Sequence, residues 1–198
     1  MKRILLLTLS CLLLGFLLMG ADCEILSFDS QSMPVIVKIS EEFHIQGSNT
    51  DLSDSDIIDM ASILADNSID YSKIDSITIQ NIEITFKENN GPNEIQFSSA
   101  YASFRPIPGS TFYQLVSLND YSNLFTNIVG ISFNPLSAAA EYVLGTNPTN
   151  IAFLSNYISQ SPPKSFEVVS GLSGIATASL PADFKVDMAI TVQVHYTP

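Results

Sequence analysis

The chain contains two histidines, His44 and His195, whose imidazole rings exchange protons most readily near neutral pH. Both occupy polar positions in stretches where apolar and polar residues alternate, one near each end of the chain. If those stretches are neighbouring strands, the two histidines could approach each other and a carboxylate such as Glu42 or Asp187. That arrangement would give an acid–base pair or a metal site. The simpler interpretation is two solvated histidines, so His44 and His195 are weak surface-site candidates.

The motifs of common enzymes are missing from the sequence. Gly171-Leu172-Ser173-Gly174 is followed by Ile175, so the Gly-x-Ser-x-Gly motif of a serine hydrolase is not completed. The chain has no phosphate-binding glycine loop and no His-Glu-x-x-His. No carboxylate pair stands out for glycoside hydrolysis. We therefore expect no catalytic residue, no cofactor and no metal, and a protein that is not an enzyme.

Four aspartates, Asp51, Asp54, Asp56 and Asp59, raise the question of a calcium site. They lack the glycine and the terminal glutamate of an EF-hand loop. Acidic residues also stabilise the start of a helix, because the first turn carries unpaired N–H groups. Helix capping is therefore the preferred interpretation.

The N-terminal residues 1–23 have the layout of a secretory signal, with a basic start, an apolar run over 4–19 and small residues after it. Cys23 follows the apolar run, where a bacterial lipoprotein carries its acylated cysteine, although Asp22 departs from that pattern. Ordinary cleavage after the small residues is the second possibility. An uncleaved membrane anchor is the third, and its 16 apolar residues are short of the ~20 that span a bilayer.

The composition excludes some partners. The chain carries 8 Lys and Arg against 20 Asp and Glu, a formal net charge of −12. Nucleic acid is excluded as a partner because phosphate binding needs a basic patch. Membrane contact is expected only through the signal segment or an acylated Cys23. The absence of tryptophan weakens a carbohydrate-binding interpretation, although Tyr and Phe could replace it.

Residues 24–33 are polar and predict a short tether, and residues 34–198 a single domain. Period-two alternation predicts strands over 35–45 and 184–196. A strand over 73–87 changes its apolar parity at Gln80-Asn81, which indicates a β-bulge. The turn at 89–93 contains Asn-Gly and predicts a hairpin with a return strand from Ile95. Further strands are predicted over 112–118 and 128–133, and from Phe166.

Three helices are predicted. The first covers 54–66, with Ser53 as N-cap and Asp56 as its capping-box partner. Asn134-Pro135 and Asn147-Pro148 open two more, over 136–144 and 149–159, because Asn caps a helix and Pro suits its first turn. About seven strands with one buried face and two or three short helices predict an antiparallel β-sandwich, immunoglobulin-like or related.

The segments KIDSITI (73–79), which follows a predicted helix, and PADFKV (181–186), which opens the last strand, resemble uncharacterised exported β-sandwich proteins of Gram-negative bacteria, many of them lipoproteins. This group implies a sandwich fold and export, and brings no activity or site residues.

The leading functional hypothesis is an exported cell-envelope domain that binds or scaffolds an unknown protein, located in the periplasm, at the outer membrane or outside the cell. The second is a carrier of a small apolar ligand in a cavity between sheet and helices. An aromatic set in the hairpin region could line such a cavity, although core packing is its simpler role: Phe97, Tyr101, Phe104, Phe112 and Tyr113. A hydrolase is the third hypothesis, and it requires a cleft that joins His44 or His195 to carboxylates.

Overall fold

The computed structural model describes residues 32–118, 124–126, 128–133 and 145–197. Residues Ser32–Pro198 form one compact unit. Cys23, the rest of the predicted signal and most of the predicted tether lie outside the described residues, as does the helix predicted over 136–144. No helix within the described ranges combines the length and apolar character needed to cross a bilayer.

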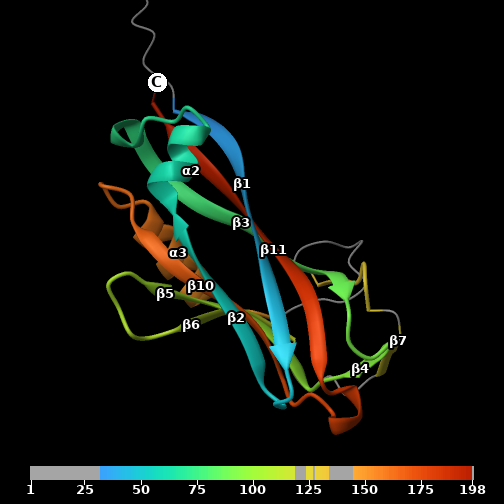
Figure 1. Cartoon of the computed structure of the whole chain (residues 1–198). Helices are drawn as coiled ribbons and strands as arrows, with labels where there is room; N and C mark the ends of the chain where they lie inside the picture. The colour runs from blue at the N-terminus through green and yellow to red at the C-terminus, as the bar shows by residue number, and fades with distance from the viewer. Residues whose placement is uncertain (1–31, 119–123, 127, 134–144, 198) are drawn as a thin grey trace, which may run out of the picture. The chain divides into compact units, whose positions relative to one another are not determined.

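The fold is mainly β, with two antiparallel main sheets (Figure 1). One has the strand order β1-β11-β3-β8, the other β2-β10-β5-β6-β9, and β4 and β7 form a separate pair. The strands are β1 (Met33–Gly47), β2 (Leu52–Asp59), β3 (Ile74–Asn89), β4 (Glu94–Gln96), β5 (Ser99–Pro106), β6 (Tyr113–Leu118), β7 (Leu124–Thr126), β8 (Ser132–Phe133), β9 (Gly145–Thr146), β10 (Ser165–Ser173) and β11 (Ala182–Tyr196). The predicted sandwich-like architecture is confirmed, with more strands than the seven expected.

The predicted first and last strands are neighbours. β1 and β11 pair antiparallel over their full length, from Met33 opposite Tyr196 to Gly47 opposite Ala182. β11 also pairs with β3, so the three long strands run side by side (Figure 1). Their alternating sequences place one set of side chains in the core and the other outside, which is what period-two patterning predicts.

The predicted bulge in β3 is confirmed. Thr191 lies opposite Asn81 and Val192 opposite Ile79, so Gln80 is the extra residue. The shift lets Ile77 and Ile82, which have opposite parity, both face the core, where each is at most 2% exposed.

The helix predicted over 54–66 is wrong in its first half. Residues 52–59 form β2, which pairs with β10, and α2 (Met60–Asp66) follows. The N-cap is Asp59, whose carboxylate accepts the N–H of Ala61, and not Ser53. Strand pairing with β10 provides the backbone partners that a cap would otherwise supply, so tertiary contacts override the local signal.

The predicted hairpin after β3 is also wrong. The two neighbours of β3 are β11 and β8, whereas β4 pairs with β7, and β5 with β10 and β6. The Asn-Gly turn exists, and the N–H of Asn90 donates to the carbonyl of Asp183. A turn reverses the chain without choosing the partner strand, and here β11 already occupies that side of β3.

The strand predicted over 128–133 is reduced to β8. The N–H of Ile131 donates to the carbonyl of Ile128, and Gly130 has a φ of +88°, which closes a turn before β8 begins. The strand predicted over 112–118 corresponds closely to β6.

Helix α3 (Pro148–Ile158) is confirmed. Asn147 is its N-cap and accepts the N–H of Asn150, and proline opens the first turn. Leu154 and Ile158 are buried, and Ile151 packs against the core from a half-buried position.

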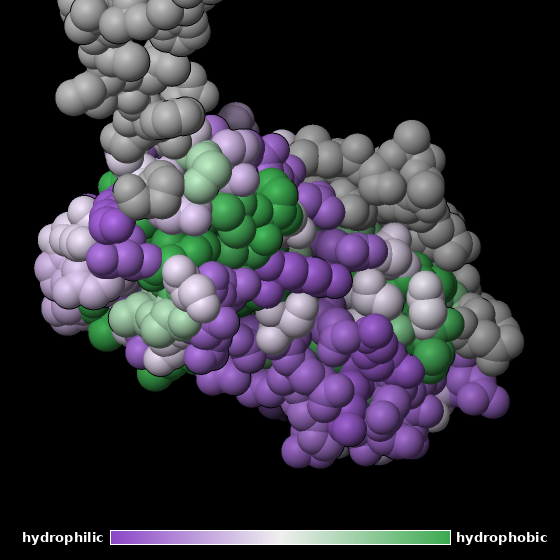
Figure 2. Space-filling model, turned by 90° about the horizontal axis from the view of Figure 1, so that it is seen from above, coloured by the Kyte–Doolittle hydropathy of each residue, from purple (hydrophilic) through white to green (hydrophobic). Residues whose placement is uncertain are grey.

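The outer surface carries both hydrophobic and hydrophilic residues. Seen from above, hydrophobic surface lies framed by hydrophilic residues (Figure 2). Among the described residues the large hydrophobic side chains with more than a third of their surface exposed are Met33, Ile36, Ile57, Tyr71, Phe112, Val129 and Phe153. Scattered exposure of this kind is normal, and only clustered cases call for an explanation.

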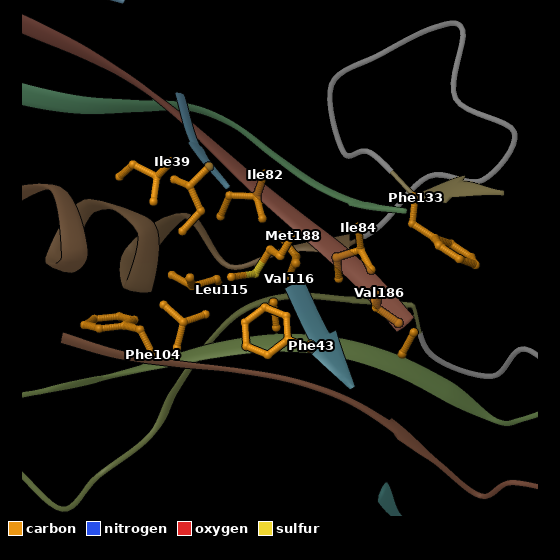
Figure 3. Close-up of a cluster of buried hydrophobic side chains, with 14 of the residues drawn as sticks. Ile39, Phe43, Ile82, Ile84, Phe104, Leu115, Val116, Phe133, Val186 and Met188 are labelled. Carbon is orange, nitrogen blue, oxygen red and sulfur yellow. The ribbon is translucent and has the colours of Figure 1, made fainter. Parts of the chain in front are cut away.

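The core fills the space between the two main sheets. One buried cluster contains Ile39 and Phe43 of β1, Val186 and Met188 of β11, and Phe104 of β5 (Figure 3). Leu115 and Val116 of β6 complete it from the second sheet. Because the described chain contains no cysteine, this packing carries the stability of the folded unit.

Candidate ligand groove

The structure separates the two histidines. His195 lies opposite Pro34 in the register of β1 and β11, whereas His44 lies opposite Lys185. Their positions are therefore ten residues apart along β11, which corresponds to about 33 Å at 3.3 Å per strand residue. Pairing of the first and last strands does not bring His44 and His195 together.

His44 is engaged by aspartates other than the predicted Asp187. Its Nε2 lies 2.7 Å from Oδ1 of Asp183, and its backbone N–H donates to Asp54 at 2.9 Å. Both partners of the His44–Asp183 pair are more than a third exposed, so water screens their attraction.

The two carboxylates predicted near the histidines bind lysines. Asp187 lies 3.0 Å from Nζ of Lys87, and Glu42 lies 3.4 Å from Nζ of Lys185. Glu88, followed by Glu42, raises the pKa of Lys185 by stabilising its charged form. These are surface ion pairs on the outer face of the first sheet.

One carboxyl group between the sheets, that of Glu41, has a raised pKa. Burial raises the pKa of Glu41 in β1, and the charge and hydrogen bond of Asp56 in β2 raise it further. The four aspartates considered for calcium serve different roles. Asp59 caps α2, and Asp56 accepts the N–H of Ile57. Asp54 accepts the N–H groups of His44 and Ser55, and Asp51 accepts that of Gly174. Within the described ranges, no three His, Cys, Asp or Glu residues are placed to hold a metal ion.

The predicted aromatic set does not line one cavity. Phe97 is fully buried and stacks on Phe125 with ring centroids 5.2 Å apart. Phe104 packs instead against Tyr113 at 5.4 Å and against Phe166 at 6.4 Å. These rings are core residues of the sandwich.

A cavity of about 550 Å³ lies between β3 and α3, and we refer to it as the β3–α3 groove. Its apolar walls are formed by Ile77, Ile79 and Ile82 of β3 and by Pro148, Ile151 and Ala152 of α3. Its polar lining residues are Asp75, Ser76, Thr78, Gln80, Asn81, Thr146, Ser155, Asn156 and Ser159. The volume is within the ~300–1,000 Å³ typical of small-molecule sites.

The groove exists because α3 stands where a neighbouring strand would otherwise pair. In the described residues β8 pairs only with Ile84 and Thr85, so the first half of β3 has no strand on its outer side. The N–H of Ile77 donates to Oγ of Ser159 at 2.9 Å, and that of Ile79 to Oγ of Ser155 at 3.3 Å. A helix held at a strand edge through side chains leaves more space than a paired strand.

One residue that lines the groove carries an unsatisfied polar atom. Oδ1 of Asn81 is buried and has no hydrogen-bond partner in the described part of the chain. A buried acceptor without a partner costs free energy, on the order of 1–3 kcal/mol. Asp75, at the exposed start of β3, is the ionisable residue among the described lining residues.

The prediction of a cavity between sheet and helices did not identify these residues. Ser155 and Ser159 are four residues apart, and therefore lie on one face of α3 together with Ile151 and Ala152. That mixed face of α3 is visible in the sequence. The part of β3 that it contacts, whose outer edge has no strand in the described residues, follows only from the strand order.

No family model matches the chain, and no curated protein matches it. Solved structures similar to it include a protein of Parabacteroides distasonis ATCC 8503 predicted to be secreted, with 13% identity and a TM-score of 0.46. That likeness covers 83% of this chain and 50% of the other, so the chain spans half the length of that protein.

Viral coat proteins are also similar in structure. The Turnip Yellow Mosaic Virus protein has 10% identity and a TM-score of 0.37, over 84% of this chain and 95% of the viral one. The BFDV capsid protein of a 60-mer has 8% identity and a TM-score of 0.41, over 86% of this chain and 97% of the viral one. At such low identity these similarities concern the fold alone, and the chain weakly resembles a protein predicted to be secreted.

Proposed function

We propose that this chain is an exported, non-enzymatic binding domain that carries a small apolar ligand in the β3–α3 groove. The observation that supports this function most directly is the groove itself, a cavity of about 550 Å³ with isoleucine walls. A protein scaffold, the first hypothesis from sequence, has no comparable feature in its favour.

The groove favours a particular kind of ligand. Ile79 and Ile151 are half-buried and line it, so a hydrocarbon portion would replace water against aliphatic side chains. The net charge of −12 and the nearby Asp75 disfavour anions. The expected ligand is therefore a neutral, mostly hydrocarbon molecule.

The non-enzymatic part of the proposal rests on the groove chemistry. Ser155 and Ser159 could serve as nucleophiles by type, but their hydroxyl oxygens accept backbone N–H groups of β3, and no described histidine lines the groove. The hydrolase hypothesis requires His44 or His195 beside carboxylates in a cleft, and neither histidine is among the residues that line the β3–α3 groove.

Export and anchoring remain part of the proposal. The signal-like residues 1–23 support export, and Cys23 is the candidate acylation site. Each buried methylene adds about 0.8 kcal/mol to membrane attachment, so acylation of Cys23 would hold the domain at a membrane.

A groove-filling variant tests the ligand site. Ala152 is exposed on α3 and lines the groove, so Ala152→Trp should occupy the cavity without disturbing the core. The matched control is Ala65→Trp, because Ala65 is exposed on α2 and does not line the groove. The chain has no tryptophan of its own, so each new indole reports on folding by its fluorescence.

The probe is N-phenyl-1-naphthylamine, a neutral apolar fluorophore. We expect its fluorescence to rise with the wild type and with Ala65→Trp, and its affinity to fall about tenfold or more with Ala152→Trp, which corresponds to about 1.4 kcal/mol. Equal binding by wild type and Ala152→Trp would place the probe elsewhere and reject the groove as the ligand site.

A further inference from the structure

A second hollow lies on the outer face of the five-stranded sheet, and we refer to it as the outer-face depression. Its volume is about 460 Å³, and it is lined by Ser53, Asp54 and Ser55 of β2, Tyr101 and Ser103 of β5, Phe112, and Glu167 and Val169 of β10. It shares no lining residue with the β3–α3 groove. Its interpretation therefore does not depend on the proposed function.

Tyr101 is held against the sheet by a glycine. Gly171 is its register partner on β10, and a Cβ atom built there would lie 2.6 Å from both Cζ and the hydroxyl oxygen of Tyr101. The phenol ring therefore lies directly over the Gly171 backbone, in space that any other residue would fill. An aromatic ring fixed on a sheet in this way offers its remaining surface to solvent or to a ligand.

Phe112 forms a second fixed ring. The guanidinium carbon of Arg105 lies 4.9 Å from its ring centroid, and Arg105 also pairs with Glu167. Phe112 is nevertheless 45% exposed. Nε of Arg105 is buried and has no partner in the described part of the chain. This arrangement keeps an exposed aromatic ring in one place beside a polar hollow.

The polar lining consists of acceptors and hydroxyls. Ser53 and Ser55 of β2 and Ser103 of β5 provide hydroxyl groups, and Glu167 of β10 provides a carboxylate that pairs with Arg105. The carboxylate of Asp54 is directed away from this face, because it accepts the backbone N–H of His44 in β1. Fixed rings beside hydrogen-bonding groups suit a molecule that has C–H faces and hydroxyl edges at the same time.

We infer that the outer-face depression binds a neutral saccharide. The C–H face of a sugar would stack on Tyr101 or on the exposed part of Phe112, and its hydroxyls would bond Ser53, Ser55 and Ser103. Charge disfavours ionic ligands here. The net charge of −12 disfavours anions, and the guanidinium group of Arg105 on the ring of Phe112 repels a cation.

The test is a titration of the processed full chain, as isolated, with maltohexaose, cellohexaose, mannohexaose and chitohexaose, followed by amide NMR shifts. We expect at least one oligosaccharide to shift amides of β5 and β10 around Tyr101 and Gly171. Phe112→Ala should weaken that binding about threefold to tenfold, because aromatic contacts contribute ~0.5–1.5 kcal/mol. Phe112 lies outside the strands, so this variant should fold.

The matched control is Tyr71→Ala. Tyr71 is 46% exposed and does not line the depression, so its loss should leave the affinity unchanged. Saccharide binding that persists in Ala152→Trp would show independence from the β3–α3 groove. The inference is overturned if no oligosaccharide shifts these amides at about 10 mM, if Phe112→Ala binds as the wild type does, or if tetramethylammonium binds there instead.

Discussion

Oγ of Ser159 accepts a hydrogen bond from the backbone N–H of Ile77 at 2.9 Å, across 82 residues of sequence. The same hydroxyl donates to the carbonyl of Ser155 at 2.7 Å, within α3. Ser159 therefore joins the end of α3 to the first half of β3, on the edge opposite to β11. The helix shields a strand edge that would otherwise present free N–H and C=O groups, and it fixes one wall of the β3–α3 groove.

The first prediction concerns this link. Ser159→Ala should leave the N–H of Ile77 without its partner and lower the free energy of unfolding by about 1 to 2 kcal/mol. For a chain of this size the melting temperature should fall by about 2 to 8 °C, measured by circular dichroism. Ser155→Ala is the comparison, because its bond to Ile79 is longer, at 3.3 Å, and its loss should cost less. A melting temperature unchanged by Ser159→Ala would contradict this role.

The second prediction distinguishes the observed start of α2 from the one expected from sequence. Asp59→Ala should lower the free energy of unfolding by about 1 kcal/mol, since its carboxylate accepts the N–H of Ala61 and the hydroxyl of Ser62. Ser53→Ala should change it by less than about 0.5 kcal/mol, because Ser53 is exposed on β2. Urea unfolding of both variants measures the two values. The reverse order would support a helix that begins after Ser53.

The sequence predicted those elements whose local pattern and tertiary environment agree. β1 and β11 alternate because one face is buried along their whole length, and the parity change at Gln80 reports the bulge directly. Asn147-Pro148 opens α3 as predicted, since capping depends on neighbouring residues only.

The errors arise where a distant partner decides the conformation. Ser53 and Asp56 have the spacing of a capping box, yet residues 52–59 pair with β10 as a strand, so Ile57 is 61% exposed while Ile58 is 1% exposed. The turn at Gly91 is correct, but the hairpin is not, because β11 competes for the side of β3. Strand order depends on the whole chain and cannot be obtained from local patterns.

The candidate sites also depend on strand order and register, which local patterns do not predict. His44 and His195 lie on neighbouring strands, as their approach would require, but the antiparallel register separates them. The β3–α3 groove depends on the edge of β3 that is occupied by α3 and not by a strand. The outer-face depression depends on Tyr101 lying over Gly171. These relationships join residues from different strands and helices, and no spacing in the sequence encodes them.

The third prediction concerns the N-terminal segment. In a Gram-negative host we expect the intact mass to lack residues 1–22 or 1–23. A membrane-bound product that begins at Cys23 and carries diacylglycerol and acyl mass would establish a lipoprotein, and Cys23→Ser should then abolish the modification. A soluble product that begins at Glu24 would indicate a diffusible binder. A full-length product in the membrane fraction would contradict export by cleavage.

The fourth prediction concerns pH. Burial and the neighbouring Asp56 raise the pKa of Glu41 in the folded protein, whereas in the unfolded chain it is near 4.3. The folded state therefore holds the Glu41 proton more tightly, and its stabilising contribution is fully present below the unfolded pKa. That contribution is lost as the pH rises through the raised folded value. A deprotonated Glu41 loses its hydrogen bond to Asp56, and this loss destabilises the contact between β1 and β2.

Glu41→Gln should remove this pH-dependent loss, because an uncharged amide can still donate to Asp56, as the protonated carboxyl group does. We expect the melting temperature of Glu41→Gln to exceed that of the wild type by about 1 to 3 °C at pH 7, and the difference to vanish near pH 4. The control is Glu42→Gln, which removes the ion pair with Lys185 and should give no gain at pH 7. If Glu41→Gln were less stable than the wild type at pH 7, the carboxylates of β1 and β2 would not repel each other, and another contact of Glu41 would dominate.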